Sequence, residues 1–153
     1  MSIRTFQHVD QLHDAVGSHL GHSEWILVDQ PRVDRFADAT DDHQWIHVDP
    51  VKAAQGPFGA TVAHGYLTLS LIPSLTDGLV EVGGTGLVVN YGLDKVRFLQ
   101  PVTAGSRIRA SSTVTSAEPT AQGVRATFTI TVEIEGATKP ALIAETVVLY
   151  FAA

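Results

Sequence analysis

The sequence predicts an α+β fold in which an antiparallel β-sheet curls around one long central helix. Apolar residues lie on nearly every side of a helical wheel over residues 63–75, as expected of a helix enclosed by other structure. After Gly83 the chain is rich in Val, Ile, Thr and aromatic residues that alternate with a period of two, which is typical of strands. No helical segment separates these strands, so they lack the crossover connections that parallel pairing requires.

The N-terminal third predicts two helices and one strand. Apolar residues recur at helical spacing over residues 9–20, and Gly21 is the expected stop. Residues 24–28 predict a strand. Residues 29–38 predict a second helix with Pro31 in its first turn, and a polar loop follows it directly.

The central helix is expected to kink or end near Pro73, which has no amide to donate to Leu69. Beyond it, five segments predict strands, and they are residues 86–90, 94–98, 106–116, 124–135 and 142–151. Every second residue over 124–134 is apolar, which predicts a sheet with one buried face.

Length and composition indicate one globular domain over residues 1–153. A chain of this size can bury one sizeable core but is short for two full domains. The net charge of -6 would repel a phosphate backbone, so we expect no nucleic-acid partner. Cysteine is absent from the sequence, which excludes disulfides, thiolate metal sites and a cysteine nucleophile.

We expect a soluble, cytoplasmic protein without a membrane partner. Residues 53–76 contain no Asp, Glu, Lys or Arg, and a run of that length can suggest a membrane span. Polar residues and two prolines interrupt it, so a helix buried in a soluble core explains it better. The N-terminus has no basic start followed by an apolar stretch, so no export signal is expected.

The polar loop over residues 41–50 is the most informative segment of the chain. Its ionisable residues alternate with apolar ones, so the loop should be partly buried, and buried charge is costly unless it has a partner or a function. The ordinary alternative is a solvated turn or a helix cap. The density of ionisable groups favours a chemical site that includes Asp42 and His47.

The stretch Asp41-Asp42-His43-Gln44-Trp45-Ile46-His47-Val48-Asp49 resembles the signature Gly-Asp-x-Asn-Pro-x-His-x-Asp of the MaoC-like dehydratases, which include the R-specific enoyl-CoA hydratases. Its Gln-Trp form is similar to the nodulation-protein-N-like branch of that family. The later stretch His64-Gly65-Tyr66-Leu67-Thr68-Leu69-Ser70 resembles the entry to the central helix of a hot-dog fold. The resemblance covers the chain from about Phe36 to the C-terminus.

The resemblance implies a single hot-dog domain that adds water to trans-2-enoyl-CoA and gives R-3-hydroxyacyl-CoA. It places the catalytic carboxylate on Asp42, the catalytic imidazole on His47, and the amide that binds the thioester oxygen on Gly65. We also expect His64 and Gln44 to contact the substrate. The family's Gly, Asn and Pro are replaced in this loop, which alters the expected shape of the pocket but keeps the catalytic pair.

This chemistry explains why such residues belong together. Water loses a proton as it attacks C3, C2 gains a proton, and negative charge gathers on the thioester oxygen. An imidazole ordinarily titrates near neutral pH, so His47 together with Asp42 could hold the water, accept its proton and return one to C2, in either division of labour. The amide of Gly65 could stabilise the enolate oxygen, although tight packing of helix against strand explains a glycine equally well.

Two further polar positions lie on predicted strands. Arg97 and Lys95 should share a face and could attract the phosphates of coenzyme A, although exposed basic residues on a strand are ordinary. Asn90 and Tyr91 could line the pocket, and the alternative is a strand end and a core aromatic.

No metal or resident cofactor is expected, with coenzyme A entering only as part of the thioester substrate. Asp42, His43, His47, Asp49 and His64 have suitable ligand types, but their spacing matches no specific metal pattern. No Gly-x-Ser-x-Gly elbow is present, so covalent acyl-enzyme chemistry lacks its usual nucleophile. Two alternatives to a hydratase stay open, an acyl-CoA thioesterase and a non-catalytic acyl-thioester binding protein. A homodimer is the expected assembly.

Overall fold

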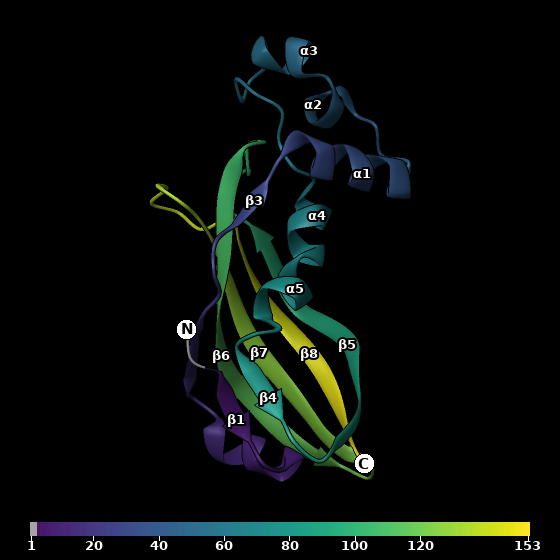
Figure 1. Ribbon diagram of the computed structural model, residues 1–153, viewed down its shortest axis with the longest axis vertical. Coiled ribbons are helices and arrows are strands. Elements are labelled where there is room, and N and C mark those ends of the chain that lie inside the picture. The colour runs from purple at the N-terminus through teal and green to yellow at the C-terminus, as the bar shows by residue number, and fades with distance from the viewer. Residues whose placement is uncertain (1–2) are drawn as a thin grey trace.

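The computed structural model describes residues 3–153 and has a main β-sheet with helices over one face (Figure 1). The strand order is β2-β6-β7-β8-β5, with β3 also paired to β6, and every pairing in this sheet is antiparallel. Its strands are β2 (His19–His22), β3 (Ile26–Val28), β5 (Thr85–Phe98), β6 (Ser106–Thr120), β7 (Gly123–Ile134) and β8 (Leu142–Ala152). The predicted α+β class with an antiparallel sheet is confirmed.

The central helix crosses the sheet in two pieces, α4 (Gly65–Ser70) and α5 (Ile72–Thr76). The predicted irregularity near Pro73 is confirmed: Pro73 falls in the first turn of α5, where a missing amide leaves no hydrogen bond broken. Leu71, between the two pieces, still has right-handed helical dihedrals. The two pieces therefore follow one another as one broken helix.

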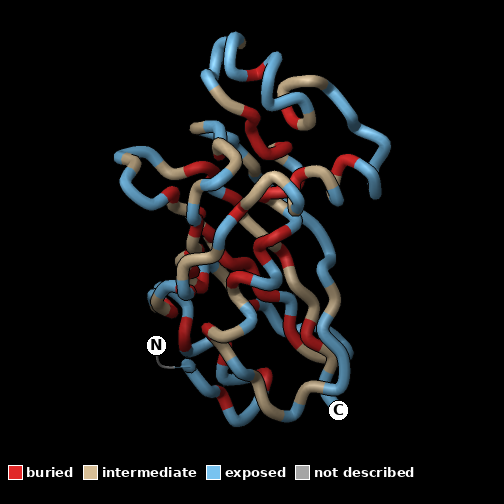
Figure 2. Tube along the Cα trace, turned by 45° about the horizontal axis from the view of Figure 1, so that its top comes forward, coloured by how far each residue is buried: buried red, intermediate tan, exposed pale blue. Residues whose placement is uncertain are grey.

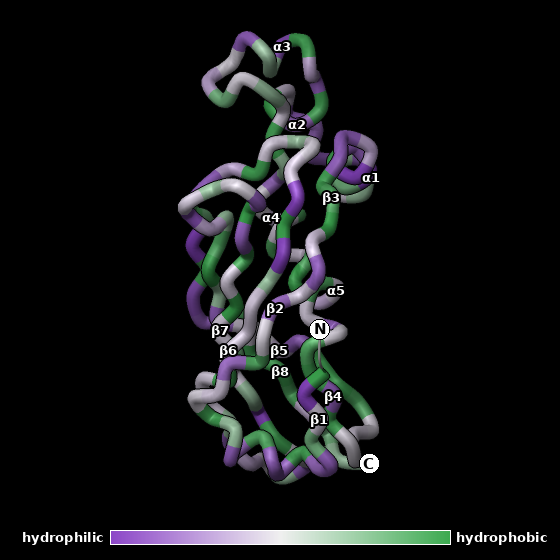
Figure 3. The backbone as a smooth tube through the Cα atoms, turned by 60° about the vertical axis from the view of Figure 1, so that its left-hand side comes forward, coloured by the Kyte–Doolittle hydropathy of each residue, from purple (hydrophilic) through white to green (hydrophobic). Residues whose placement is uncertain are grey.

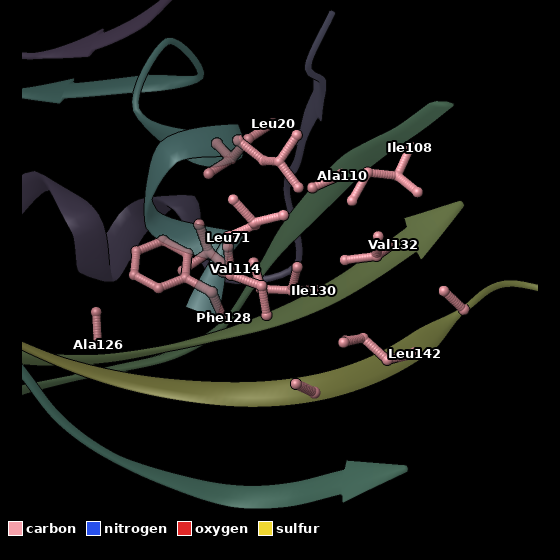
Figure 4. Packing of buried hydrophobic residues seen from close by; sticks show 14 of the residues in the cluster. Leu20, Leu71, Ile108, Ala110, Val114, Ala126, Phe128, Ile130, Val132 and Leu142 are labelled. Atoms are coloured by element: carbon pink, nitrogen blue, oxygen red, sulfur yellow. The ribbon is translucent and has the colours of Figure 1, made fainter. Parts of the chain in front are cut away.

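The core lies between this helix and the sheet. Leu71 points toward Val114, Phe128 and Ile130 of the strands beneath it (Figure 4). The alternation predicted for β7 is confirmed, because its apolar residues are all buried, namely Val124, Ala126, Phe128, Ile130, Val132 and Ile134. Burying a side chain of this size stabilises the fold by roughly 2 kcal/mol. Figure 2 shows buried stretches through the body of the molecule and further ones in the segment that projects at its top.

Strand β5 is one long strand where two shorter ones were predicted. Its pairing with β8 shifts register three times, at Gly86, Tyr91 and Asp94, each of which is an extra residue. Such bulges break the two-residue alternation, which explains why the sequence pattern appears interrupted between residues 90 and 94. The other edge of β5 is unpaired among the described residues.

The predicted helix over residues 9–20 is wrong in type and extent. A 3₁₀-helix, η1 (Val9–Ala15), ends before Gly17, which has a φ of 89° and donates its amide to the Val114 carbonyl at 2.7 Å. The chain then continues into β2. Leu12 and Leu20 are both buried, but they lie in different elements. Their helical spacing in the sequence is therefore a coincidence.

The strands β1 (Arg4–Phe6) and β4 (Val80–Val82) form a small parallel pair that the sequence did not predict. Between β3 and α4 the chain makes a helical excursion (residues 29–64), which projects from one end of the sheet (Figure 1). Its helices are α1 (Gln30–Thr40), α2 (Trp45–Val48) and α3 (Pro50–Ala54). In Figure 3 α1 is largely hydrophilic, whereas the strand β3 that leads into it is hydrophobic. None of the helices within residues 3–153 has both the length and the apolar character that a membrane crossing needs.

Candidate active site

Helix α1 leads directly into the polar loop, and both of its ends have defined caps. Asp29 caps its start by accepting a hydrogen bond from the Arg32 amide at 3.0 Å. Its end is set by Asp41, whose φ of 59° and ψ of 24° are left-handed. Asp41 is the one non-glycine residue with positive φ among residues 3–153, and Asn and Asp tolerate this region best. The reversal places Asp42 on the loop that leads to α2.

His47 lies in α2 and is almost fully buried. Its Nδ1 lies 2.6 Å from the Val62 carbonyl oxygen, which can only accept, so Nδ1 carries the proton. The lone pair of the neutral ring is therefore on Nε2. The Val62 amide also donates to the Ile46 carbonyl at 2.9 Å, so this segment holds both the backbone and the ring of the α2 turn.

A glutamine at the start of α1 holds the backbone of His47. The Nε2 group of Gln30 donates to the His47 carbonyl at 2.7 Å and to Asp34 Oδ1 at 2.8 Å, while its Oε1 accepts the Thr61 hydroxyl. Gln30 and Thr61 were not foreseen from the sequence. Their partners are 17 and 31 residues away, and no local pattern signals contacts of that kind.

His64 packs directly on His47. The ring centroids are 3.8 Å apart with an interplanar angle of 22°, and His64 is only 3% exposed. Its Nε2 donates to the Asp42 backbone carbonyl at 2.9 Å and lies 4.0 Å from Asp42 Oδ2. We call Asp42, His47 and His64 the Asp–His cluster; one side-chain nitrogen or oxygen of each lies within 4.8 Å of the others. The Asp42 side chain is 52% exposed, so the cluster opens to solvent.

His43, in the same loop, does not join the cluster. Its Nε2 pairs with Asp38 Oδ1 at 2.8 Å on the surface. The hydrogen bond to Asp38 raises the pKa of His43, and the negative charges of Asp38, Asp41 and Asp42 act in the same direction. The two histidines of this loop thus have distinct environments, one exposed and paired with an acid, the other buried.

The Asp–His cluster is also where a metal ion could be held within residues 3–153. Two ligand atoms that each lie about 2.1 Å from one first-row metal ion can be no more than about 4.2 Å apart. The 4.8 Å limit that contains the ligand atoms of the cluster is wider than this. Nε2 of His64 already donates to the Asp42 carbonyl. Metal binding through that nitrogen would require His64 to release this carbonyl, so the arrangement fits proton transfer better than metal coordination.

Gly65 begins α4 next to the cluster. Its amide makes no hydrogen bond to any residue in 3–153, as expected for the first residue of a helix. A Cβ built on Gly65 would lie 3.1 Å from the Phe98 ring. Both sequence interpretations therefore have support, because the amide is free and the helix also packs closely on β5. A small cavity of about 260 Å³ lies beside Gly65, Thr68 and Phe98.

The other predicted substrate contacts lie in different surroundings. Gln44 precedes α2, and its carbonyl accepts the His47 amide at 3.0 Å. Asn90 lines a separate apolar cavity of about 810 Å³ between the central helix and the sheet, which no member of the Asp–His cluster lines. Arg97 is exposed and donates to the Val96 carbonyl at 2.8 Å. Within one chain the structure thus brings together Asp42, His47, His64 and Gly65, but not Asn90 or Arg97.

The arrangement of sheet and central helix is the hot-dog fold. An R-hydratase of Pseudomonas aeruginosa, solved in its unliganded form, superposes with a TM-score of 0.74 over 90% of this chain and 83% of that chain, at 22% sequence identity. At that identity the likeness shows the fold alone.

Sequence comparison defines the family. The protein-family model described as "MaoC like domain" matches residues 11–135. The chain therefore belongs to the family of MaoC-like dehydratases. A 3-hydroxyacyl-thioester dehydratase Z of Mycobacterium tuberculosis is 52% identical over 98% of this chain and 100% of that protein. Nodulation protein N of Rhizobium leguminosarum bv. viciae is 48% identical over 84% of this chain and 82% of that protein. The resemblance found in the loop at residues 41–49 is confirmed.

Proposed function

We propose that this protein is an R-specific enoyl-CoA hydratase, which adds water to trans-2-enoyl-CoA to give R-3-hydroxyacyl-CoA. The observation that carries the proposal is the meeting of the Asp42 carboxylate with His47, whose Nε2 lone pair is left free by the Nδ1 hydrogen bond to Val62. A relative named as a 3-hydroxyacyl-thioester dehydratase is consistent with it. Hydration and dehydration are the two directions of one equilibrium and use the same groups.

The proposed step needs no covalent intermediate. A water molecule between Asp42 and His47 gives a proton to Nε2 of His47 as its oxygen forms a bond to C3. The electrons of the double bond move onto the thioester as an enolate. C2 then takes a proton from the protonated pair, and the enzyme returns to its starting state. Asp42 orients the water and stabilises the imidazolium in this scheme.

The free amide of Gly65 is the group that we assign to the enolate oxygen. It lies at the start of the helix that His64 precedes, so it is one residue away from the Asp–His cluster. A preorganised donor at such a place typically lowers the barrier by about 3 kcal/mol. The amide is aimed by the backbone, so it needs no side-chain rearrangement when charge develops.

The acyl chain has an apolar cavity available. The cavity of about 810 Å³ is lined by Leu69, Ile72 and Asn90 among others, and its size is in the range of small-molecule sites. We assign it to the acyl chain, with Asn90 as a polar contact at its wall. Arg97, exposed on β5, is assigned to the phosphates of coenzyme A.

We further propose that two copies of the chain pair through β5. Among residues 3–153 no strand pairs with one edge of β5. Large apolar side chains on and after this strand are exposed, namely Leu87, Val88, Tyr91, Leu93, Phe98 and Leu99. An exposed apolar edge strand is a template for pairing with another strand. Light scattering should give the mass of a dimer, and a monomer at all concentrations would contradict this part.

Steady-state hydration of crotonyl-CoA tests the function. We expect Asp42→Asn and His47→Gln to lower kcat by about 10²–10⁴-fold each, because each removes an acid–base group. His43→Gln, a change in the same loop, is the control and should retain wild-type kcat. Wild-type activity in either cluster variant would reject the assigned roles.

Two other outcomes would replace the proposal. Release of thiol from saturated acyl-CoA, without hydration of an enoyl chain, would make the protein a thioesterase. Tight acyl-CoA binding without turnover would make it a binding protein. The absence of a resident cofactor and the cytoplasmic location stay predictions.

A further inference from the structure

His64 exchanges no proton in the scheme above, but it contacts or directly precedes the three residues to which that scheme assigns a role, namely Asp42, His47 and Gly65. It is buried, it stacks on His47, and it donates to the backbone of Asp42. It also directly precedes Gly65, whose amide is assigned to the enolate oxygen. Phe36 of α1 packs against the His64 ring, with centroids 4.9 Å apart at 58°.

The proton positions of His64 are fixed by its neighbours. The Asp42 carbonyl can only accept, so Nε2 of His64 carries hydrogen and is committed to that bond. Nδ1 is buried and has no hydrogen-bond partner within residues 3–153. Neither nitrogen therefore reaches the reacting water. A buried polar atom without a partner is unfavourable, and an apolar residue would avoid it, so the presence of histidine here requires another reason.

We propose that His64 is a positioning residue that sets the placement of the Asp42 carboxylate relative to the His47 imidazole. Its Nε2–H holds the backbone of Asp42, while the face of its ring fixes the plane of the His47 ring. Both actions pass through one rigid side chain, held on a further side by Phe36. This inference rests on the proposed function, because it concerns the geometry of that acid–base pair.

Three substitutions separate the two actions. His64→Gln keeps a donor near the position of Nε2 but lacks the ring. His64→Phe keeps a stacked ring but cannot donate. His64→Ala has neither. Thermal unfolding of each variant is measured first, so that kinetic values refer to folded protein.

We expect the kinetic loss to appear in kcat and not in KM. A displacement of about 1 Å in a catalytic group can cost about 10²-fold in rate, so His64→Ala, which loses both actions, should lose about 10²-fold in kcat. His64→Gln, which keeps the donor, should regain most of that loss, and His64→Phe, which keeps the ring, should regain a smaller part of it, with KM within about threefold of wild type in all three. His43→Phe, an exposed histidine of the same loop, is the matched control and should keep wild-type kinetics.

A second readout does not depend on activity. Hydrogen exchange of the backbone amides at residues 41–44 should become faster in His64→Phe and His64→Ala, because the anchor of the Asp42 carbonyl is lost. His64→Gln should exchange like wild type. If wild type fails to hydrate any enoyl chain, the proposed function is rejected, and this exchange pattern still decides the role of His64.

Three results would overturn the proposal. Wild-type kcat in His64→Ala would show that no positioning is needed. A His64→Gln variant as slow as His64→Ala, with both folded, would show that the donor to Asp42 is not what matters. A raised KM with unchanged kcat would make His64 a substrate contact instead.

Discussion

The sheet with its central helix and the helical excursion (residues 29–64) are held together by different forces. In the sheet, apolar side chains from β6, β7 and β8 pack on the central helix over a continuous buried surface. In the excursion, α2 and α3 have four and five residues and are too short to be stable alone. Hydrogen bonds from Gln30, His47 and His64 to backbone carbonyls fix α2 and the loop before it, while Val33 of α1 joins the hydrophobic core.

This difference separates stability from chemistry. Packing in the sheet is spread over many contacts, so one change weakens the fold without redirecting any particular group. In the excursion a few directional bonds fix α2 and the loop before it, so one change can move a proposed catalytic group while most of the fold is kept. Substitutions on the two sides should therefore have opposite signatures in stability and in kcat.

The largest effect on stability is expected from Ile108→Ala in β6. Ile108 is 0% exposed and belongs to the hydrophobic core, so the cavity should cost about 2–5 kcal/mol in the free energy of unfolding. Urea denaturation measures this loss, while kcat per folded molecule should stay at the wild-type value, because Ile108 does not line the cavity assigned to the acyl chain. Thr113→Ala, on the other face of the same strand, is the control. A loss of kcat in folded Ile108→Ala would remove the proposed separation.

Gly65 lies at the boundary between the two regions and tests whether its amide or only its small size matters. In Gly65→Ala the new methyl would press on the Phe98 ring and shift the start of α4. We expect a kcat loss of about 10–10²-fold from the displaced amide, and recovery when Phe98→Ala makes room. Unchanged kcat with a lower melting temperature would assign Gly65 to packing alone.

Tyr150 should make the sheet sensitive to alkaline pH. It is 7% exposed, and burial raises its pKa from 10.0 to about 12. The native state thus keeps a proton that the unfolded chain loses, so the stabilisation is complete below pH 10 and is lost as pH rises toward about 12. The resulting decrease in the free energy of unfolding amounts to about 2–3 kcal/mol. Urea denaturation across this range should show it in wild type and not in Tyr150→Phe, with the exposed Tyr91→Phe as control.

The smallest effect is expected from Gln30→Leu in the excursion. The His47 carbonyl and the Thr61 hydroxyl lose their partner, which should cost about 1–3 kcal/mol in stability. Because the α2 turn is loosened but His47 keeps its bond to Val62, we expect kcat to fall by about tenfold. Gln122→Leu, in an exposed turn, is the matched control. Wild-type kcat in Gln30→Leu would mean that Gln30 is not needed to position His47.

The fold could be predicted from the sequence where an element buries one face and its apolar residues are therefore periodic. Alternation over residues 124–134 identified the buried side of β7, and the missing amide of Pro73 located the break in the central helix. The prediction failed over residues 9–20, where a turn at Gly17 with a hydrogen bond to Val114 overrides helical spacing. Local pattern contains no information about such a distant partner.

The site could be predicted only in part, because some of its contacts also join residues that are distant in the sequence. Asp42 and His47 share one short segment, so their density and their family resemblance were visible in the sequence. Gln30 bonds a backbone carbonyl 17 residues away, and the residues next to Gln30 in the sequence do not predict this contact. Arg97 was chosen from strand alternation, which shows the face of a strand but not its distance from a site on another element.

The central claim is that Asp42 and His47 act on the same water molecule. The most direct measurement is kcat for hydration of crotonyl-CoA by Asp42→Asn, His47→Gln and the double variant, each shown to be folded. Groups that serve one step are strongly non-additive, so we predict that the double variant is about as slow as the slower single variant. A loss in the double variant equal to the product of the two single losses would contradict the claim, and the two residues would then act independently.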